Sequence, residues 1–192
     1  NTVTVTSIIK ERDGRIVAKS KPQLITIPAS GEISVTQSIA LPTVRRWSLD
    51  DPYLYRIQYL VEHNGQLIDD RTIRFGVRHI EVKPNGVFVN GQHVKLLGTN
   101  NHQDHAGVGS ALPDYLQYYR IGLLKQMGSN AYRASHHVPT PELLDACDSL
   151  GMLVMSEQRL LNSSPEYVDQ LTRLVKRDRS RAFSASSARA SD

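Results

Sequence analysis

The sequence predicts a mixed fold, in which an antiparallel β-sandwich is followed by an α/β region built from strand–helix units. Short alternating segments separated by turn residues occupy the chain up to about residue 80, which is typical of a sandwich. Strand and helix patterns then alternate three times up to residue 179, which indicates parallel strands joined by right-handed crossovers. From Ser180 the pattern gives way to Ser, Ala and Arg, so we expect a disordered or non-native tail over 180–192.

The sandwich strands are predicted from alternation and from the turns between them. Val3 and Val5 alternate with threonines in the opening strand. Asp13-Gly14 and Asn64-Gly65 predict tight turns, because these residue types tolerate a positive φ. Further strands are expected at 16–18, 23–27, 33–39, 53–63 and 66–76.

The strands of the α/β region are predicted from a hairpin signal and from short apolar runs. Pro84-Asn85-Gly86 predicts a turn between the flanking segments, because Asn and Gly are the residues that tight hairpins favour. The apolar runs predict buried strands, and they lie at 94–98, 130–133 and 152–155.

Three amphipathic segments predict the helices of this region. The first, 113–127, is expected to end at Gly128; its predicted buried face is Leu116, Tyr119, Leu123, Leu124 and Met127. Thr140-Pro141-Glu142 begins the second with an N-cap, a first-turn proline and an early acid, and Gly151 ends it. Its predicted buried face is Leu143, Leu144, Cys147 and Leu150. The third begins at Ser164-Pro165-Glu166, and its predicted inward residues are Leu171, Leu174 and Val175.

Composition excludes several classes of protein. The 23 Lys and Arg residues are interleaved with 19 Asp and Glu residues for a net charge of +4. Nucleic-acid binding is therefore not expected, because it needs basic residues clustered on one surface. The single cysteine, Cys147, cannot form an internal disulfide, and its apolar neighbours predict a buried structural thiol.

The same reading gives expectations about compartment and processing. No apolar run reaches the roughly 18 residues of a membrane span, and the opening residues show no leader pattern. A cytoplasmic location is therefore favoured, and no membrane partner is expected. Because the chain begins inside a strand pattern without Met, we expect a cut, processed or designed fragment.

A series of motifs stands out along the chain. They are WSLDDPYLY at 47–55, FGVRHIEV at 75–82, NGQHVKLLG at 90–98, NNHQDH at 100–105, NAYRASH at 130–136 and CDSLGMLV at 147–154. In order and spacing they resemble the glycoside hydrolase family 2 enzymes. The sequence around His102 is most similar to that of members called β-galactosidases, although β-glucuronidases and β-mannosidases share the scaffold.

The resemblance implies a fold and an activity. It implies a partial immunoglobulin-like β-sandwich over 1–80 and the first three β/α units of an incomplete TIM-type barrel over 81–179. The implied activity is retaining hydrolysis of terminal β-galactosides, with a β-galactoside sugar as partner and no cofactor. The family's two catalytic Glu residues lie at later strand ends, and no position here matches them. We therefore expect a chain truncated before both, which is inactive or slow alone.

The resemblance also assigns site residues. It places His102 and His136 on sugar hydroxyls and Arg133 on nearby carboxylates, which suits the planar guanidinium. Asp104 and Glu157 complete the predicted substrate-binding set. These residues lie at or just after the C-terminal ends of three predicted strands. In a (β/α)₈ barrel, functional residues lie at this end of the strands. Asp104 and Glu157 are also the only candidates to replace the missing catalytic pair.

Other interpretations of these residues stay open. His102, Asp104 and His105 include metal-ligand types, although their spacing matches no specific metal motif, and no metal is expected. Asp104 and His105 could instead satisfy their own loop, and Arg133 could form a structural ion pair. The family commonly has Asp-Glu-Asn where this chain has Ser156-Glu157-Gln158, which favours a supporting role for Glu157.

Three alternatives to an active glycosidase follow from an incomplete barrel. Its open sheet edge and bare apolar faces predict self-association or pairing with a complementing barrel fragment. A carbohydrate-binding module without turnover is a second possibility. A small glycosidase that is active only as an oligomer is a third.

Overall fold

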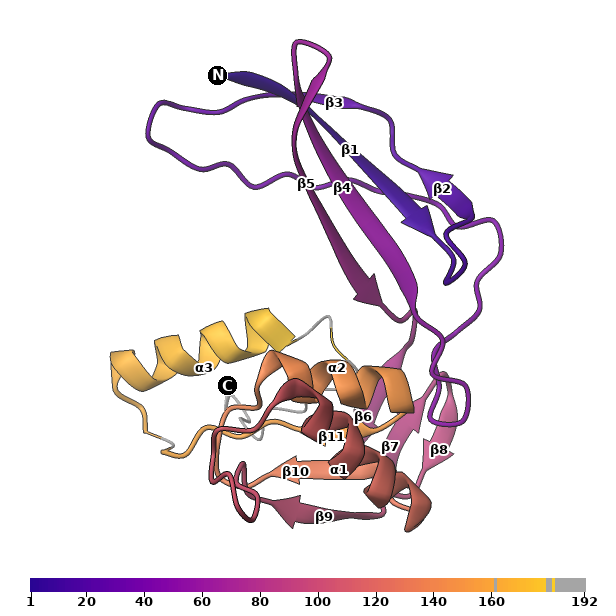
Figure 1. The fold of residues 1–192 in the computed structure, drawn as a ribbon, viewed down its shortest axis with the longest axis vertical. Coiled ribbons are helices and arrows are strands. Elements are labelled where there is room, and N and C mark those ends of the chain that lie inside the picture. The colour runs from indigo at the N-terminus through magenta and orange to yellow at the C-terminus, as the bar shows by residue number, and fades with distance from the viewer. Residues whose placement is uncertain (161, 179–180, 182–192) are drawn as a thin grey trace. The chain divides into compact units, whose positions relative to one another are not determined.

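The computed structural model describes residues 1–160, 162–178 and 181, and the chain forms two compact units (Figure 1). The first unit contains Asn1–Arg45 and Leu54–Val77, and the second contains Arg46–Tyr53 and the chain from Arg78 onward. The segment Arg46–Tyr53, which the sequence analysis included in the sandwich, therefore belongs by its contacts to the second unit.

The first unit is built on one antiparallel sheet in the order β2-β1-β4-β5, and β3 also pairs with β1. The strands are β1 (Thr2–Lys10), β2 (Ile16–Lys19), β3 (Gln23–Thr26), β4 (Tyr55–His63) and β5 (Gln66–Phe75). Asn64 and Gly65 join β4 to β5 with φ of 50° and 78°, which confirms the predicted hairpin. Its register runs from Tyr55 opposite Phe75 to His63 opposite Gln66.

The predicted strand over 33–39 is wrong, because this segment crosses the unit without joining the sheet. Val35, Gln37 and Ile39 are half-buried while the residues between them are exposed, and this produces the strand-like alternation. Side-chain hydrogen bonds hold the segment instead of a backbone ladder. Gln37 Oε1 accepts from Ser7 Oγ at 2.5 Å, and Gln37 Nε2 donates to the Val5 carbonyl at 3.1 Å.

The second unit opens with an antiparallel sheet of β6 (Ile80–Lys83), β7 (Gly86–Val89) and β8 (Gln92–Val94), which confirms the hairpin at 84–86. The predicted strand over 94–98 is wrong, because β8 ends at Val94 and β9 (Gly98–Asn101) begins at the other end of that run. The Asn130 side chain forms hydrogen bonds with backbone groups of the segment between the two strands. It accepts from Leu97 N at 2.8 Å and donates to the Lys95 carbonyl at 2.9 Å.

A parallel sheet in the order β11-β10-β9 forms the centre of this unit. Between its strands lie the helices α1 (Asp114–Gln126) and α2 (Pro141–Leu150), and α3 (Pro165–Asp178) follows the last strand. The strands β9, β10 (Ala131–Ala134) and β11 (Leu153–Met155) neighbour one another in chain order. Helices α1 and α2 pack together over one face (Figure 1). Sequential strands with helices on one face are how a (β/α) barrel begins, whereas a doubly wound sheet has helices on both faces.

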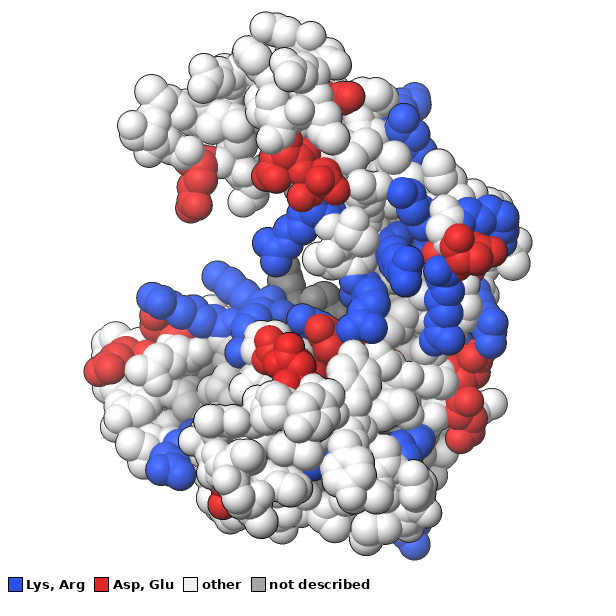
Figure 2. All heavy atoms as spheres, in the orientation of Figure 1, with Lys and Arg blue, Asp and Glu red and all other residues white. Residues whose placement is uncertain are grey.

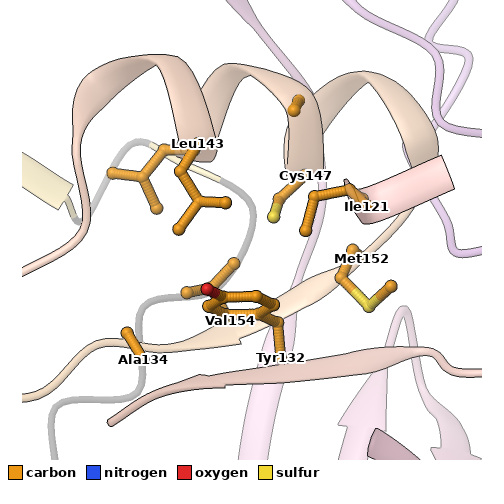
Figure 3. Close-up of a cluster of buried hydrophobic side chains, with 9 residues drawn as sticks. Ile121, Tyr132, Ala134, Leu143, Cys147, Met152 and Val154 are labelled. Atoms are coloured by element: carbon orange, nitrogen blue, oxygen red, sulfur yellow. The ribbon is translucent and has the colours of Figure 1, made fainter. Parts of the chain in front are cut away.

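The core of the second unit lies between this sheet and its two helices (Figure 3). Its fully buried members include Ile121 from α1, Cys147 from α2, Tyr132 from β10 and Val154 from β11. Burial raises the pKa of the Cys147 thiol well above its ordinary value, and the nearby Asp148 carboxylate acts in the same direction. The prediction of a buried, structural cysteine is therefore confirmed.

The predicted buried face of α1 is wrong at three of its five residues, since only Leu116 and Leu124 are half-buried. Gln117 and Ile121 are its buried residues and Leu124 is half-buried against the core, whereas Tyr119, Leu123 and Met127 are 57%, 42% and 72% exposed. Apolar side chains surround this helix on several sides, so periodicity selects the wrong stripe. The same error affects α3, where Leu174 is buried but Val175 is exposed.

The predicted ends and buried face of α2 are confirmed. Thr140 Oγ1 accepts from Leu143 N at 3.3 Å as the N-cap, and Gly151 ends the helix in the left-handed conformation with φ of 73°. A Cβ at Gly151 would lie 2.3 Å from the Leu49 carbonyl oxygen. Only glycine therefore lets the segment 46–53 approach this helix end.

Trp47 is the centre of that approach. Its side chain is fully buried and donates through Nε1 to the Asp148 carbonyl at 2.7 Å. Lys125 Nζ donates to the carbonyls of Leu49 and Gly151 at 3.2 and 3.1 Å. These bonds hold the segment 46–53 against the C-terminal ends of α1 and α2.

On the face drawn in Figure 2, acidic and basic side chains lie beside one another. No helix in the described ranges is long and apolar enough to cross a membrane. The predicted tail over 180–192 lies outside the described residues except for Arg181. The Arg181 guanidinium forms ion pairs with the carboxylates of Asp145 and Asp148.

Candidate functional site

Three strand ends bring the predicted site residues to one edge of the parallel sheet. His102 and Asp104 follow β9, His136 follows β10, and Glu157 follows β11. Arg133 lies within β10, opposite Asn100 of β9. Because the carboxyl ends of parallel strands share an edge, residues from 102 to 157 meet here.

Glu157 is the hub of this edge. Its Oε1 accepts from Arg133 Nη2 at 2.8 Å, and its Oε2 lies 3.1 Å from His136 Nδ1. Arg133 also donates through Nη1 to Asn100 Oδ1 at 3.0 Å. The Glu157 side chain is 18% exposed, against 36% for Arg133 and 52% for His136. A half-buried carboxylate therefore fixes a cation on one side and a more exposed imidazole on the other.

A pocket with a cavity volume of about 690 Å³ opens beside this hub. It is lined by loop residues 102–104, 135–138 and 158–160 and by Tyr167 and Gln170 of α3. His102 and His136 meet edge to face at its wall, with ring centroids 6.3 Å apart. Three of the five predicted residues, His102, Asp104 and His136, thus line one pocket. Arg133 and Glu157 do not line it and reach it through His136.

The loop conformations that carry these side chains are held by backbone contacts. Arg120 of α1 donates through Nη2 to the His102 carbonyl at 2.7 Å. A cis peptide bond joins Ser135 to His136, and Arg159 Nε donates to the His136 carbonyl at 3.4 Å. The imidazole at 136 is therefore supported through its own peptide as well as through Glu157.

His137 has a pKa below the ordinary value for histidine. Burial lowers its pKa from the ordinary 6.5, and the hydrogen bond between its Nδ1 and the Ser135 carbonyl opposes that shift only in part. The nearby His102 and Arg120 lower the pKa further, whereas Glu157 raises it. The fold therefore disfavours the charged form of the His137 imidazole at this wall of the pocket.

The residues suit a polyhydroxylated ligand better than a metal ion. Within the described ranges, no group of three or more His, Cys, Asp and Glu side chains is arranged to hold a metal. His105 pairs with Gly109 across a small loop, and its Nδ1 bonds the Ala106 carbonyl at 3.0 Å. Imidazoles, a carboxylate and amides on one wall offer the mixed donors and acceptors that sugar hydroxyls need.

Tyr167 and Gln170 of α3 line the pocket and were not predicted from the sequence. Gln158 Nε2 donates to Gln170 Oε1 at 2.9 Å, which ties the loop after β11 to α3. The only local signal was the spacing of Tyr167 and Gln170, which places them about one turn apart on a helix. Nothing in the sequence indicates that this face of α3 lies beside the loop after β10.

A parallel sheet in sequential order, with helices on one face and a polar pocket at its carboxyl edge, defines a TIM-barrel type of protein with its site at the usual end. Residues 80–181 match the model of the TIM barrel domain of glycosyl hydrolases family 2, and residues 1–78 match a second model of glycosyl hydrolases family 2. The chain belongs to glycoside hydrolase family 2. Its fold is a part of the family's sandwich followed by the start of its barrel, as predicted.

Individual relatives agree with this assignment. A β-galactosidase of Bacteroides ovatus is 34% identical over 156 residues, which is 81% of this chain and 18% of the relative. A putative β-glucuronidase of Formosa agariphila is 38% identical over 112 residues, or 58% of this chain and 14% of the relative. The crystal structure of a family 2 member from Bacteroides cellulosilyticus superposes with a TM-score of 0.82 at 32% identity, covering 95% of this chain and 26% of that one. The chain thus spans less than a fifth of the length of these curated relatives.

Proposed function

We propose that this chain provides the sugar-positioning part of a retaining β-galactosidase, and that its pocket takes the terminal galactosyl unit. The observation that carries the proposal is the hydrogen-bonded set Arg133–Glu157–His136 beside a pocket at the carboxyl edge of the sheet. Family membership limits the reaction to glycoside hydrolysis. The galactoside is put first because the sequence around His102 is most similar to that of members called β-galactosidases. Coverage does not separate the two sugars, since a β-galactosidase and a putative β-glucuronidase cover 81% and 76% of the chain at the same 34% identity.

In this proposal Glu157 is a positioning residue. It engages His136 through Nδ1, which leaves Nε2 to bond a sugar hydroxyl, and the Arg133 guanidinium holds the carboxylate in place. His102 supplies a second imidazole at the same wall, and the Asp104 carboxylate accepts from hydroxyls. Fixed groups of this kind lower the entropy cost of binding and orient the glycosidic bond.

The chain alone is not expected to be an efficient catalyst. Retaining hydrolysis needs two carboxyls about 5–5.5 Å apart, one as acid/base and one as nucleophile. Both oxygens of Glu157 already have partners in Arg133 and His136. We therefore expect the chain to bind a galactoside weakly and to release product slowly or not at all.

The test combines binding with turnover. Methyl β-galactoside is titrated into the pure chain and into His136→Ala, and binding is followed by ligand-observed NMR. Binding that is lost in His136→Ala supports the proposal. Absence of binding to the parent chain would overturn it. Robust hydrolysis of a chromogenic β-galactoside that survives repurification would overturn the expectation that the catalytic carboxyls are missing, and Asp104 and Glu157 would then be the carboxylates to mutate.

A β-glucuronide is the second candidate because of Arg159. This side chain lines the pocket and, among the residues the structure describes, has no carboxylate partner. A guanidinium in that place could pair with the carboxylate of a uronic acid. If methyl β-glucuronide binds more tightly than methyl β-galactoside, and Arg159→Gln removes the difference, the second candidate replaces the first.

A further inference from the structure

A second cavity belongs to the first unit and takes no part in the site described above. Its volume is about 560 Å³, and it lies between residues 19–23, which connect β2 to β3, and the segment 36–40. This volume falls within the ~300–1,000 Å³ of typical ligand pockets. All of its lining residues belong to the first unit, and the proposed galactoside contacts use none of them.

One wall of this cavity is basic. Lys19 and Lys21 contribute two ammonium groups, and no acidic side chain is among the described residues that line the cavity or pair with these lysines. Ser20 lies between them and is only 8% exposed, and its Oγ accepts from Ser7 N at 2.9 Å. Within the described chain the Ser20 hydroxyl hydrogen has no acceptor, so the hydroxyl can still donate. Two cations and a spare donor favour an anionic ligand.

The other wall offers backbone groups without partners. In the part of the chain that the structure describes, no backbone N–H or carbonyl of residues 36–40 forms a hydrogen bond. Half-buried and exposed residues alternate along 35–39, as they do in a strand. The segment is held through the Gln37 side chain, which bonds Ser7 and Val5, so its backbone stays available. A strand-like edge of this kind is a template for another chain.

We propose that this groove binds an extended acidic peptide, which adds as a strand along 36–40 and places its carboxylates against Lys19 and Lys21. A free oxyanion would satisfy the lysines but not the backbone carbonyls of the other wall, because an anion only accepts hydrogen bonds. A peptide backbone presents donors and acceptors in the same alternating order as the wall, which is how strand addition gains its affinity. The inference is independent of the galactoside site.

The first experiment measures peptide binding to the full 192-residue chain by fluorescence anisotropy. The probe is a labelled, end-capped heptapeptide in which Glu and Thr alternate. A matched peptide has Gln in place of each Glu, and a third peptide keeps Glu but is N-methylated at two adjacent central residues. The Glu peptide is expected to bind about fivefold more tightly than the Gln peptide, because the lysines pair with its carboxylates. N-methylation is expected to weaken binding at least about tenfold, because it removes N–H donors and blocks strand pairing.

The second experiment changes the protein. The double variant Lys19→Gln/Lys21→Gln is expected to bind the Glu peptide about fivefold more weakly and the Gln peptide as the parent does. Lys95→Gln/Lys176→Gln is the matched control, because it removes the same charge from exposed positions of the second unit. The control is expected to bind both peptides as the parent does. These substitutions change exposed side chains, and thermal unfolding checks that each variant is folded.

Several outcomes would overturn the inference. If the Glu peptide does not bind, or if the control variant loses as much affinity as Lys19→Gln/Lys21→Gln, the groove is not a peptide site. If the N-methylated peptide binds as tightly as its parent and dextran sulfate displaces both, the groove recognises charge alone and a polyanion replaces the peptide as its ligand. None of these outcomes changes the galactoside proposal, because no sugar of that class is used.

Discussion

At the scale of single residues, the ion pair between Arg133 and Glu157 is distinguished by its partial burial. A second pair, Arg173–Asp169 on α3, has nearly the same separation, 2.7 Å against 2.8 Å, but its side chains are 78% and 54% exposed. Exposed pairs contribute little because water screens them, whereas a charge left unpaired in a partly buried site keeps its desolvation cost. The two pairs therefore provide a matched comparison.

We expect Glu157→Gln to lower the free energy of unfolding by about 1 kcal/mol and Asp169→Asn to lower it by less than about 0.5 kcal/mol. Glu157→Gln should also weaken galactoside binding, since His136 loses the carboxylate at Nδ1. Urea denaturation of both variants beside the parent chain measures the first effect and NMR titration the second. Equal losses of stability in the two variants would contradict the importance given to burial.

His137 is expected to make the stability of the folded chain depend on pH. Its pKa is lowered in the folded state by burial, so the unfolded chain binds more protons once the pH falls to about 6.5. Stability is therefore expected to fall as the pH drops through that value, and to stop falling below the lowered pKa of the folded state. Urea midpoints at pH 7.5 and 5.5 measure this. His137→Gln should show a smaller change between the two pH values, and an unchanged difference would refute the assignment.

At the scale of elements, Gly151 has two roles: it ends α2, and it leaves room for the segment 46–53. A comparison with Gly128, which only ends α1, separates the two. Gly151 and Gly128 both follow helices with positive φ, of 73° and 87°. A Cβ at Gly128 meets nothing within 4 Å, whereas one at Gly151 would lie 2.3 Å from the Leu49 carbonyl oxygen. Gly128→Ala therefore measures the backbone cost alone, and Gly151→Ala adds the displacement of the segment 46–53.

Gly128→Ala is expected to lower the free energy of unfolding by about 1 kcal/mol, the usual cost of a left-handed alanine. Gly151→Ala should cost at least about 2 kcal/mol, because the clash with backbone adds to that cost. Thermal or urea unfolding of the two variants gives the comparison. Equal costs would mean that the segment 46–53 yields freely and does not depend on the glycine.

At the scale of the whole molecule, the two compact units interrupt each other in sequence. Trp47 lies between β3 and β4 in the chain, yet its side chain is buried in the second unit and bonds Asp148. Its fluorescence should therefore report the unfolding of the second unit. We expect the fluorescence of Trp47 to change when the helix Pro141–Leu150 unfolds, and not when β3 and β4, its neighbours in the chain, unfold.

The prediction uses one large-to-small substitution in each unit. Leu144→Ala, in the core of the second unit, is expected to lower the stability measured by Trp47 fluorescence by about 2–5 kcal/mol. Ile9→Ala, in the sheet of the first unit, should change that transition less and shift the circular dichroism of the strands. The reverse order would show that Trp47 reports the first unit.

The site was predictable to the extent that it depends on strand ends. His102, Asp104 and His136 were placed together because each follows a parallel strand, and Arg133 and Glu157 because they lie at the same edge. Tyr167 and Gln170 were not, because their approach depends on how α3 packs against the loop after β11. The functional roles given to all these residues remain predictions until binding is measured.

The sequence by itself determined the order of elements, the turns at Asn64-Gly65 and Gly151, and the family, because these depend on local backbone preferences and on motifs in order. Only the tertiary structure decided the buried face of α1, the absence of a strand at 33–39 and the place of Trp47 in the second unit. Each of these depends on which neighbour removes a side chain from water or takes its hydrogen bonds. Those neighbours lie far along the chain, where alternation and periodicity carry no information about them.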